Sequence, residues 1–341
     1  MNRLRQSAPA WCLFLLAPMV GELLSGSSPP TRFFSPPALV VLAVLYGGGA
    51  LLIREARLRW NKGWPTVLAL GAAYGLTEEG LMVKSLFDPH WPGLGDWGAV
   101  GRAWGVNWIW GLNLTIYHAI FSIAIPILLI ELAFPGRQAD SWVGRRTKFL
   151  LGALFIGDVL LGFSEMTSYR PPAPQYVLTL LAVAGLIALA GGLPGSLVRA
   201  TSSSFKTRGP AGTGLAAFLG TVAFFGVAWG LPASGLPPWL LAGATAGVLA
   251  GTCFAVVTLT GGGRGLGPVH RLSLAGGALG FFILLSPLQE FGRGAPGMTL
   301  VGLAFVGILV WIGRRVHHAG THLDPSAGPL AFIPRAGDPD A

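Results

Sequence analysis

The feature that most constrains this chain is a series of apolar stretches, each roughly 18 to 25 residues long, that recur along almost the whole sequence. A helix of that length spans the ~30 Å of hydrocarbon in a bilayer. Composition agrees, because 52% of the 341 residues are hydrophobic and only 11% are charged, against about 25% charged in a typical soluble domain. The sequence therefore predicts an all-α, polytopic helical membrane protein.

We expect about ten transmembrane helices. Their spans are about 10–27, 37–57, 65–87, 108–133, 149–166, 174–193, 211–230, 238–259, 270–287 and 297–313. With the N-terminus in the cytoplasm, most basic residues fall in cytoplasmic loops, as the positive-inside rule requires. Of the 23 Lys and Arg residues, five fall on the other side: Arg32, Lys84, Arg102, Arg170 and Arg293. This asymmetry predicts that both termini are cytoplasmic.

The formal net charge of +9 does not indicate a nucleic-acid partner, because the basic residues lie mainly in the expected cytoplasmic loops. The lipid bilayer is the expected partner, and the cell membrane is the expected location, which is the cytoplasmic membrane if the protein is bacterial. The first span follows Arg3 and Arg5, as the core of a signal peptide would. Pro29 and the lack of an A-x-A-like site favour a retained helix.

The two halves of the chain differ in polar content. Ionisable residues within the spans concentrate before about residue 170, whereas the later spans are rich in Gly, Ala and Leu. We therefore expect a site-bearing membrane half of five to six helices at 1–200 and a scaffold half of four helices at 201–316. Residues 317–341 contain Pro, Gly and Asp without an apolar period, which is typical of a disordered tail, here cytoplasmic.

Glycines recur inside the spans at positions where they allow close helix approach. Such glycines include Gly47, Gly48, Gly49, Gly185, Gly243, Gly247 and Gly251. The first three precede Arg54 and Glu55 at the cytoplasmic end of the second span. We expect these two charged residues to pair with other groups at that end, such as Glu131.

Glu78 and Glu79 lie side by side within an apolar span. Two adjacent carboxylates in hydrocarbon are costly unless they face a protein interior, water or a partner. Their span runs outward, which places the pair in the outer half of the membrane, and His118 lies near the middle of the next span. The sequence therefore predicts an outward-facing intramembrane site with these three residues as catalytic candidates. Residues expected to support it or contact substrate are Glu22, Asn113, Tyr117, Asp158 and Glu165.

The stretch from Gly75 to Leu81, which contains the Glu pair, is followed by Lys84 and by His118 in the next span. This pattern resembles the CAAX-protease and bacteriocin-processing family of intramembrane proteases. Members carry a Glu-Glu pair followed by Arg, and a His after an aromatic residue in a later helix. The resemblance implies that one Glu activates water and that His118 assists peptide hydrolysis. Here the basic residue stands one place later, and Leu114 occupies the aromatic position.

The residues leave several functions open. The site fits a membrane-embedded hydrolase, but also a proton-coupled or small-solute or lipid transporter, a non-catalytic lipid- or partner-binding protein, or a polar network that only holds helices together. The ligand would be a small molecule, a lipid or a peptide. No cofactor is expected. The presence of a metal ion is left open, because Glu and His are metal ligands, but the sequence does not have the HExxH spacing of a typical metal site. The sequence makes no prediction of oligomeric state.

The longest outer loop, from Asp88 to Asn107, carries Trp91, Trp97 and Trp104. Loops of this length within compact proteins are often functional lids. The alternative is a segment that lies in the membrane interface, held there by its indole rings.

Overall fold

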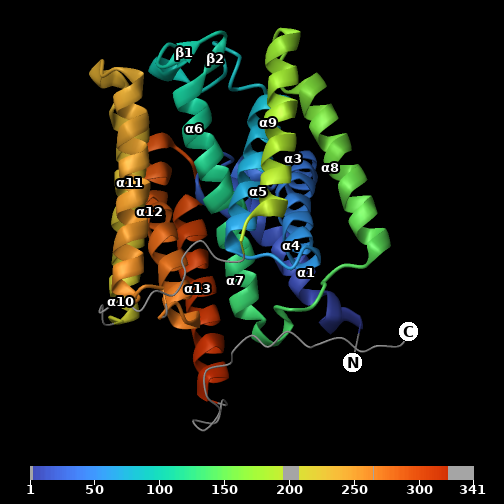
Figure 1. The fold of residues 1–341 in the computed structure, drawn as a ribbon, viewed down its shortest axis with the longest axis vertical. Coiled ribbons are helices and arrows are strands. Elements are labelled where there is room, and N and C mark those ends of the chain that lie inside the picture. The colour runs from blue at the N-terminus through green and yellow to red at the C-terminus, as the bar shows by residue number, and fades with distance from the viewer. Residues whose placement is uncertain (1–2, 195–206, 264, 322–341) are drawn as a thin grey trace.

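The computed structural model describes residues 3–194, 207–263 and 265–321, which form a bundle of long helices (Figure 1). Among the described residues, nine helices are long and apolar enough to cross a membrane, and they match nine of the ten expected spans. The remaining span is a helix over residues 64–82, whose two glutamates lower its hydropathy. The chain is thus an all-α, multi-pass membrane protein, and its helices imply a lipid bilayer around it.

The first four spans contain several consecutive helical segments each. The first has α1 (Arg3–Pro18) and η1 (Met19–Leu24), and the short α2 (Pro30–Phe33) leads into the second, with α3 (Pro36–Leu42), η2 (Ala43–Gly48) and α4 (Gly49–Arg59). The third has α5 (Trp64–Leu76) and η3 (Thr77–Met82), and the fourth has α6 (Trp108–Tyr117), η5 (His118–Ala124) and α7 (Ile125–Ala133).

The later spans are more regular. They are α8 (Arg145–Glu165) after the short η6 (Pro135–Arg137), α9 (Ala173–Gly192), α10 (Pro210–Phe225) with η7 (Gly226–Gly230), α11 (Pro238–Leu259) after η8 (Pro232–Ser234), α12 (Pro268–Arg293) and α13 (Met298–Thr321). The helices α10, α11 and α12 all begin at a proline, whose fixed φ and missing N–H suit the first turn.

Several spans contain a π-helical turn, namely η1, η2, η3, η5 and η7. Such turns are rare and occur frequently at functional sites. The turn η1 packs against η5, and η5 packs against α5, which continues into η3. Irregular helical geometry is therefore concentrated where the first, third and fourth spans meet.

One glycine allows the first two spans to cross closely. A Cβ at Gly47 would lie 2.1 Å from the carbonyl oxygen of Phe14. Pro18 has no N–H to bond this carbonyl, so the position is open to a neighbouring backbone. The expectation of close approach at Gly47 is confirmed. It is wrong for Gly185, Gly243, Gly247 and Gly251, because a Cβ at each would meet nothing within 4 Å.

The start of α1 and the end of α13 lie at the same end of the molecule (Figure 1). The last helix reaches Thr321, so the expectation that the tail starts at residue 317 is wrong for residues 317–321, which are helical. Arg315 explains the extension, because its guanidinium donates to the carbonyl of Ala133 at 3.1 Å and ties the last turns to α7. The rest of the expected tail and the boundary expected at residue 200 lie outside the described residues, and the cytoplasmic assignment of both termini stays a prediction.

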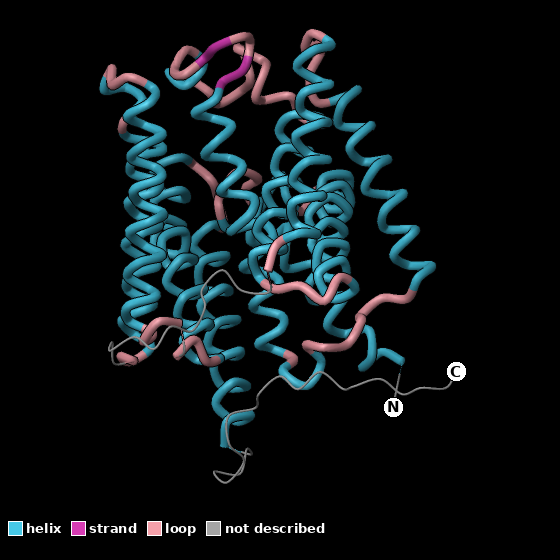
Figure 2. The backbone as a smooth tube through the Cα atoms, in the orientation of Figure 1, coloured by secondary structure: helices cyan, strands magenta, loops and turns pink. Residues whose placement is uncertain are grey.

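The third span also ends earlier than expected, at Met82 rather than Phe87. Lys84 takes a left-handed conformation with φ of 64°, which an α-helix does not allow. The long outer loop begins here. It contains η4 (Gly95–Gly98) and an antiparallel hairpin of β1 (Arg102–Ala103) and β2 (Val106–Asn107), drawn in magenta in Figure 2.

This outer loop is fixed over the end of α6. The side-chain amide of Asn107 donates to the carbonyl of Trp97 at 2.5 Å, and the Trp97 and Trp110 rings lie 5.9 Å apart. Arg102 donates to the carbonyl of Phe87 at 2.8 Å. Trp104 stands alone at the hairpin tip, 85% exposed. The loop is therefore a packed segment with one indole pointing outward.

Candidate functional site

Four π-helical turns bring five polar side chains together within the bundle. Glu22 comes from η1, Tyr46 from η2, the Glu78–Glu79 pair from η3 and His118 from η5. We call these five residues the outer cluster. His118 is only 2% exposed and Glu78 is 6% exposed. The sequence predicted four of the five, because Tyr46 was not among its candidates.

His118 lies between the two glutamates of the pair. Its Nε2 is 3.0 Å from Glu79 Oε1, and its Nδ1 is 3.0 Å from Ser122 Oγ and 3.4 Å from Glu78 Oε2. Ser122 follows His118 by one helical turn, so the same helix holds the ring in place. Both ring nitrogens therefore face oxygen atoms, which suits an imidazole that accepts and releases protons.

Tyr46 connects two carboxyl groups from different helices. Its hydroxyl oxygen is 2.6 Å from Glu22 Oε1 and 2.5 Å from Glu78 Oε1. A hydroxyl has one proton and can donate to only one of them. Both contacts are hydrogen bonds only if the other carboxyl group is protonated and donates to Tyr46. The second oxygen of Glu22 accepts from Ser28 Oγ at 2.7 Å. The geometry thus requires a proton shared among these groups.

The two members of the glutamate pair differ in how they are bonded. Glu79 uses both oxygens, one toward His118 and one in a short contact from Ser85 Oγ. Trp110 Nε1 donates to the same Ser85 hydroxyl at 3.1 Å. Glu78 Oε2 is buried and forms no hydrogen bond within the described residues. Glu79 is therefore fixed by two hydrogen bonds. Glu78 Oε2 lies 3.4 Å from His118 Nδ1, and the buried Tyr74 hydroxyl, which has no hydrogen bond among the described residues, also interacts with Glu78.

Two of the expected support residues lie beside the outer cluster. Tyr117 donates to the carbonyl of Gly21 at 2.5 Å, and its ring lies 5.3 Å from the His118 ring. Asn113 instead accepts from Thr245 Oγ1 of α11 at 3.4 Å. Tyr117 thus borders the cluster, whereas Asn113 links α6 to the second half of the chain.

Of the remaining expected residues, Asp158 interacts with Tyr74, whose ring lies 5.8 Å from the His118 ring, whereas Glu165 does not join the outer cluster. Asp158 is 7% exposed on α8, and its Oδ2 has no hydrogen bond within the described residues. Glu165 is exposed at the outer end of the same helix. Lys84 donates to the carbonyls of Phe163 and Thr167 at 2.6 and 2.8 Å, where α8 ends. This lysine caps a helix C-terminus and points away from the glutamate pair.

Glu78, Glu79 and His118 could hold a metal ion, because one ligand atom from each lies within 4.8 Å of the others. Glu79 faces Nε2, however, and Glu78 faces Nδ1. The three residues match the number of protein ligands in catalytic zinc sites. The two carboxylates approach different ring nitrogens, an arrangement that also suits proton transfer to and from the imidazole.

A second buried cluster lies at the opposite end, where the sequence predicted pairing. Arg54 contacts Glu55 at 3.1 Å and Glu131 at 3.3 Å, and Arg57 contacts Glu131 at 2.5 Å. We call these four residues the inner cluster. Arg54 also lies 3.3 Å from the centre of the Trp142 ring and donates to backbone carbonyls of the loop between α7 and α8. The prediction is confirmed, and the cluster holds this loop in place.

The residues missed by sequence reasoning are Tyr46, Tyr74, Ser85, Ser28 and Trp110; the Tyr74 ring lies 5.8 Å from the His118 ring and its hydroxyl interacts with Glu78. Tyr46 carried one signal, because it places a hydroxyl within an otherwise apolar span. Ser85 carried none, since it follows Glu79 by six residues across the end of a helix, and helical spacing does not pair such positions.

A model of a family described as an uncharacterized membrane protein family matches residues 12–267, a segment that includes the whole outer cluster. No curated protein and no solved structure matches the chain.

Proposed function

The chain belongs to this uncharacterized membrane protein family, and we propose that it is a membrane-embedded hydrolase whose outer cluster activates water. The observation that carries the proposal is the position of His118 between Glu79 and Glu78, with one Glu78 oxygen that forms no hydrogen bond among the described residues. A general base must reach the proton that it removes, and an adjacent imidazole must be oriented by a third group. In the outer cluster, Glu78 is the base, His118 is the imidazole, and Glu79 is the group that orients it.

The contacts assign a role to each residue. Glu78 Oε2 is the base that takes a proton from water as the water oxygen bonds to the substrate carbonyl carbon. Glu79 positions His118 through the 3.0 Å contact and is itself held by Ser85. His118 then gives a proton to the leaving group as the bond to the carbonyl carbon breaks, and the Glu78 proton restores the imidazole. The Tyr46 hydroxyl, which also contacts Glu22, holds the other Glu78 oxygen.

The sequence resemblance to the intramembrane proteases supports a peptide substrate. It rests on Glu78, Glu79 and His118, which are the residues that lie together. Lys84 does not support it, because that side chain bonds to the end of α8. The proposal therefore depends on the outer cluster and not on the basic residue.

The proposal is tested by comparing protein N-termini in cells that lack the chain, cells that carry it, and cells that carry Glu78→Gln. We expect new membrane-protein N-termini that appear with the unsubstituted chain and are absent with Glu78→Gln. A matched control is Glu165→Gln, which changes an exposed glutamate outside the cluster. If the same new termini are present with Glu78→Gln, or if the chain creates none, the hydrolase proposal is wrong.

A proton-coupled transporter is the second candidate, favoured by the hydroxyl of Tyr46 between two carboxyl groups. A transport path must also continue to the other side of the membrane. Below the outer cluster the buried side chains Leu13, Val67 and Leu70 are apolar, which counts against such a path. Uptake of labelled solutes into vesicles under a pH gradient would favour the transporter if it required Tyr46.

A further inference from the structure

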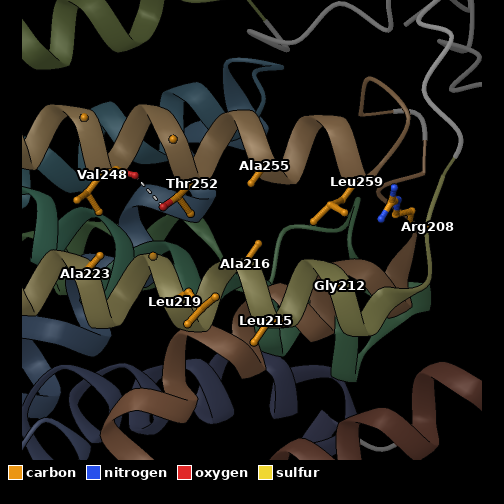
Figure 3. A pocket seen from close by; sticks show the side chains of 13 residues that line it. Arg208, Gly212, Leu215, Ala216, Leu219, Ala223, Val248, Thr252, Ala255 and Leu259 are labelled. Carbon is orange, nitrogen blue, oxygen red and sulfur yellow. Dashed lines mark hydrogen bonds between the residues drawn. The ribbon is translucent and has the colours of Figure 1, made fainter.

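A groove runs between α10 and α11, on the side of the molecule away from the outer cluster. Figure 3 shows Thr252, Ala255 and Leu259 of α11 pointing toward Ala216 of α10, with Arg208 at one end. The groove has a volume of about 590 Å³, within the range of small-molecule sites. It is an elongated apolar groove between two helices.

The groove is closed on its floor and open along its length. A Cβ at Gly220 would lie 2.3 Å from Thr252 Oγ1, so the two helices touch there. Gly247 and Gly251 line the open part, where an added Cβ would meet nothing within 4 Å. The Thr252 hydroxyl bonds to the carbonyl of Val248 in its own helix. The groove therefore accepts methylene groups and offers no free hydrogen bond to a polar ligand along its length.

The end of the groove carries a positive charge. The backbone of Arg208 is fixed, because its N–H donates to Leu259 at 2.9 Å and its carbonyl is 2.9 Å from His270 Nε2. Its side chain is exposed, and no described carboxylate lies within ion-pair distance of it. This end is expected to be cytoplasmic, where the leaflet is rich in anionic lipids and basic sites between helices bind their headgroups.

We propose that the groove between α10 and α11 binds one acyl chain of an anionic phospholipid, whose phosphate pairs with Arg208. The apolar groove fits the acyl chain. The guanidinium of Arg208, which pairs with no described carboxylate, lies at the expected cytoplasmic end and fits the headgroup. This site is separate from the outer cluster and does not depend on the proposed hydrolysis.

The test uses the purified full chain in nanodiscs that contain equal amounts of phosphatidylglycerol and phosphatidylcholine with the same acyl chains. Native mass spectrometry then counts the lipids that stay bound. We expect the unsubstituted chain to retain phosphatidylglycerol several-fold over phosphatidylcholine. Arg208→Gln should bring the ratio near one, and Gly251→Leu, which fills the groove, should reduce both lipids.

Two matched controls separate the groove from general effects. Arg59→Gln removes an exposed basic residue of α4, and Gly243→Leu adds a side chain to the exposed face of α11 outside the groove. Both should retain lipid as the unsubstituted chain does. The proposal fails if Arg208→Gln matches Arg59→Gln, or if Gly251→Leu matches Gly243→Leu. It also fails if the chain is a dimer that Gly251→Leu dissociates and Gly243→Leu does not, because a second copy would then occupy the groove.

Discussion

The outer and inner clusters are both buried and charged, but their charges are balanced differently. In the inner cluster, every carboxylate oxygen of Glu55 and Glu131 accepts a hydrogen bond, from donors that include Arg54, Arg57 and Lys148. The outer cluster sets three carboxyl groups against a single imidazole, and one oxygen of Glu78 has no hydrogen bond in the described structure. The inner cluster also has a buried atom without a hydrogen bond among the described residues, Arg54 Nε, so the excess of carboxyl groups is what distinguishes the outer cluster.

The difference has an energetic meaning. Removing one partner of a buried ion pair is strongly destabilising, because the other charge is left uncompensated. Crowded like charges cost stability and persist where function needs them. Substitutions in the inner cluster should therefore change stability most, and substitutions of the titratable residues of the outer cluster should change activity most.

The largest effect is expected for His118→Gln. Glutamine retains a polar side chain but cannot accept and release a proton at neutral pH, so we expect cleavage to fall by about 10² to 10⁴-fold, the usual contribution of acid–base catalysis. The rate is measured on a peptide that contains a cleavage site found in cells. His90→Gln, in the exposed part of the outer loop, should keep full activity. Equal rates for the two variants would remove His118 from the mechanism.

The next largest effect is expected for Arg54→Met. This change leaves Glu55 and Glu131 short of a buried cation and frees the loop carbonyls that Arg54 binds. We expect a loss of about 3 to 5 kcal/mol in the free energy of unfolding, measured by chemical unfolding in detergent. Arg59→Met, at an exposed position of the same helix, should lose under about 0.5 kcal/mol. Similar values for both would show that the inner cluster does not stabilise the fold.

A smaller effect is expected for Tyr46→Phe. The carboxyl groups of Glu22 and Glu78 then lose the hydroxyl between them. We expect a stability loss of about 1 to 3 kcal/mol, as for other buried groups left unsatisfied. The same energy lost from the transition state corresponds to a roughly 5- to 150-fold loss of activity. Tyr169→Phe, which changes a hydroxyl outside the outer cluster, is the control. Full activity in Tyr46→Phe would separate Tyr46 from the site.

The smallest effect is expected for Ser122→Ala. His118 Nδ1 then faces only Glu78, at 3.4 Å. We expect the activation free energy of the reaction to rise by about 0.5 to 1.5 kcal/mol, the net value of one hydrogen bond. This change should lower kcat more than it raises KM. An unchanged kcat would show that Ser122 does not orient the ring.

The helices could be predicted from the sequence because the length of each apolar stretch matches the thickness of the bilayer, and the basic loops mark its cytoplasmic side. Glu78, Glu79, His118 and Glu22 were found because charge in a hydrophobic span is costly. Tyr46 was missed because an aromatic ring is ordinary in an apolar span, and only the hydroxyl of this residue contacts the carboxyl groups of the site. The π-helical turns could not be predicted, since they depend on how neighbouring helices pack.

Helical spacing also misleads where the chain leaves the helix. Lys84 follows the glutamate pair closely, yet its left-handed backbone directs it to α8. Asn113 lies one helical turn from Tyr117, but it bonds to a helix more than 130 residues away in sequence. Gly247 and Gly251 have helix-packing spacing, and they line a groove. Such outcomes are set by tertiary contacts that no local pattern contains.

The most direct measurement is the thermal unfolding midpoint of Glu78→Gln beside that of the unsubstituted chain. Glutamine has the shape of glutamate without its charge, and it relieves the excess of carboxyl groups in the outer cluster. If the outer cluster is a functional site and not a structural one, the midpoint stays the same or rises by a few degrees. A fall as large as that of Arg54→Met would contradict the account, because Glu78 would then hold the fold together as the inner cluster does.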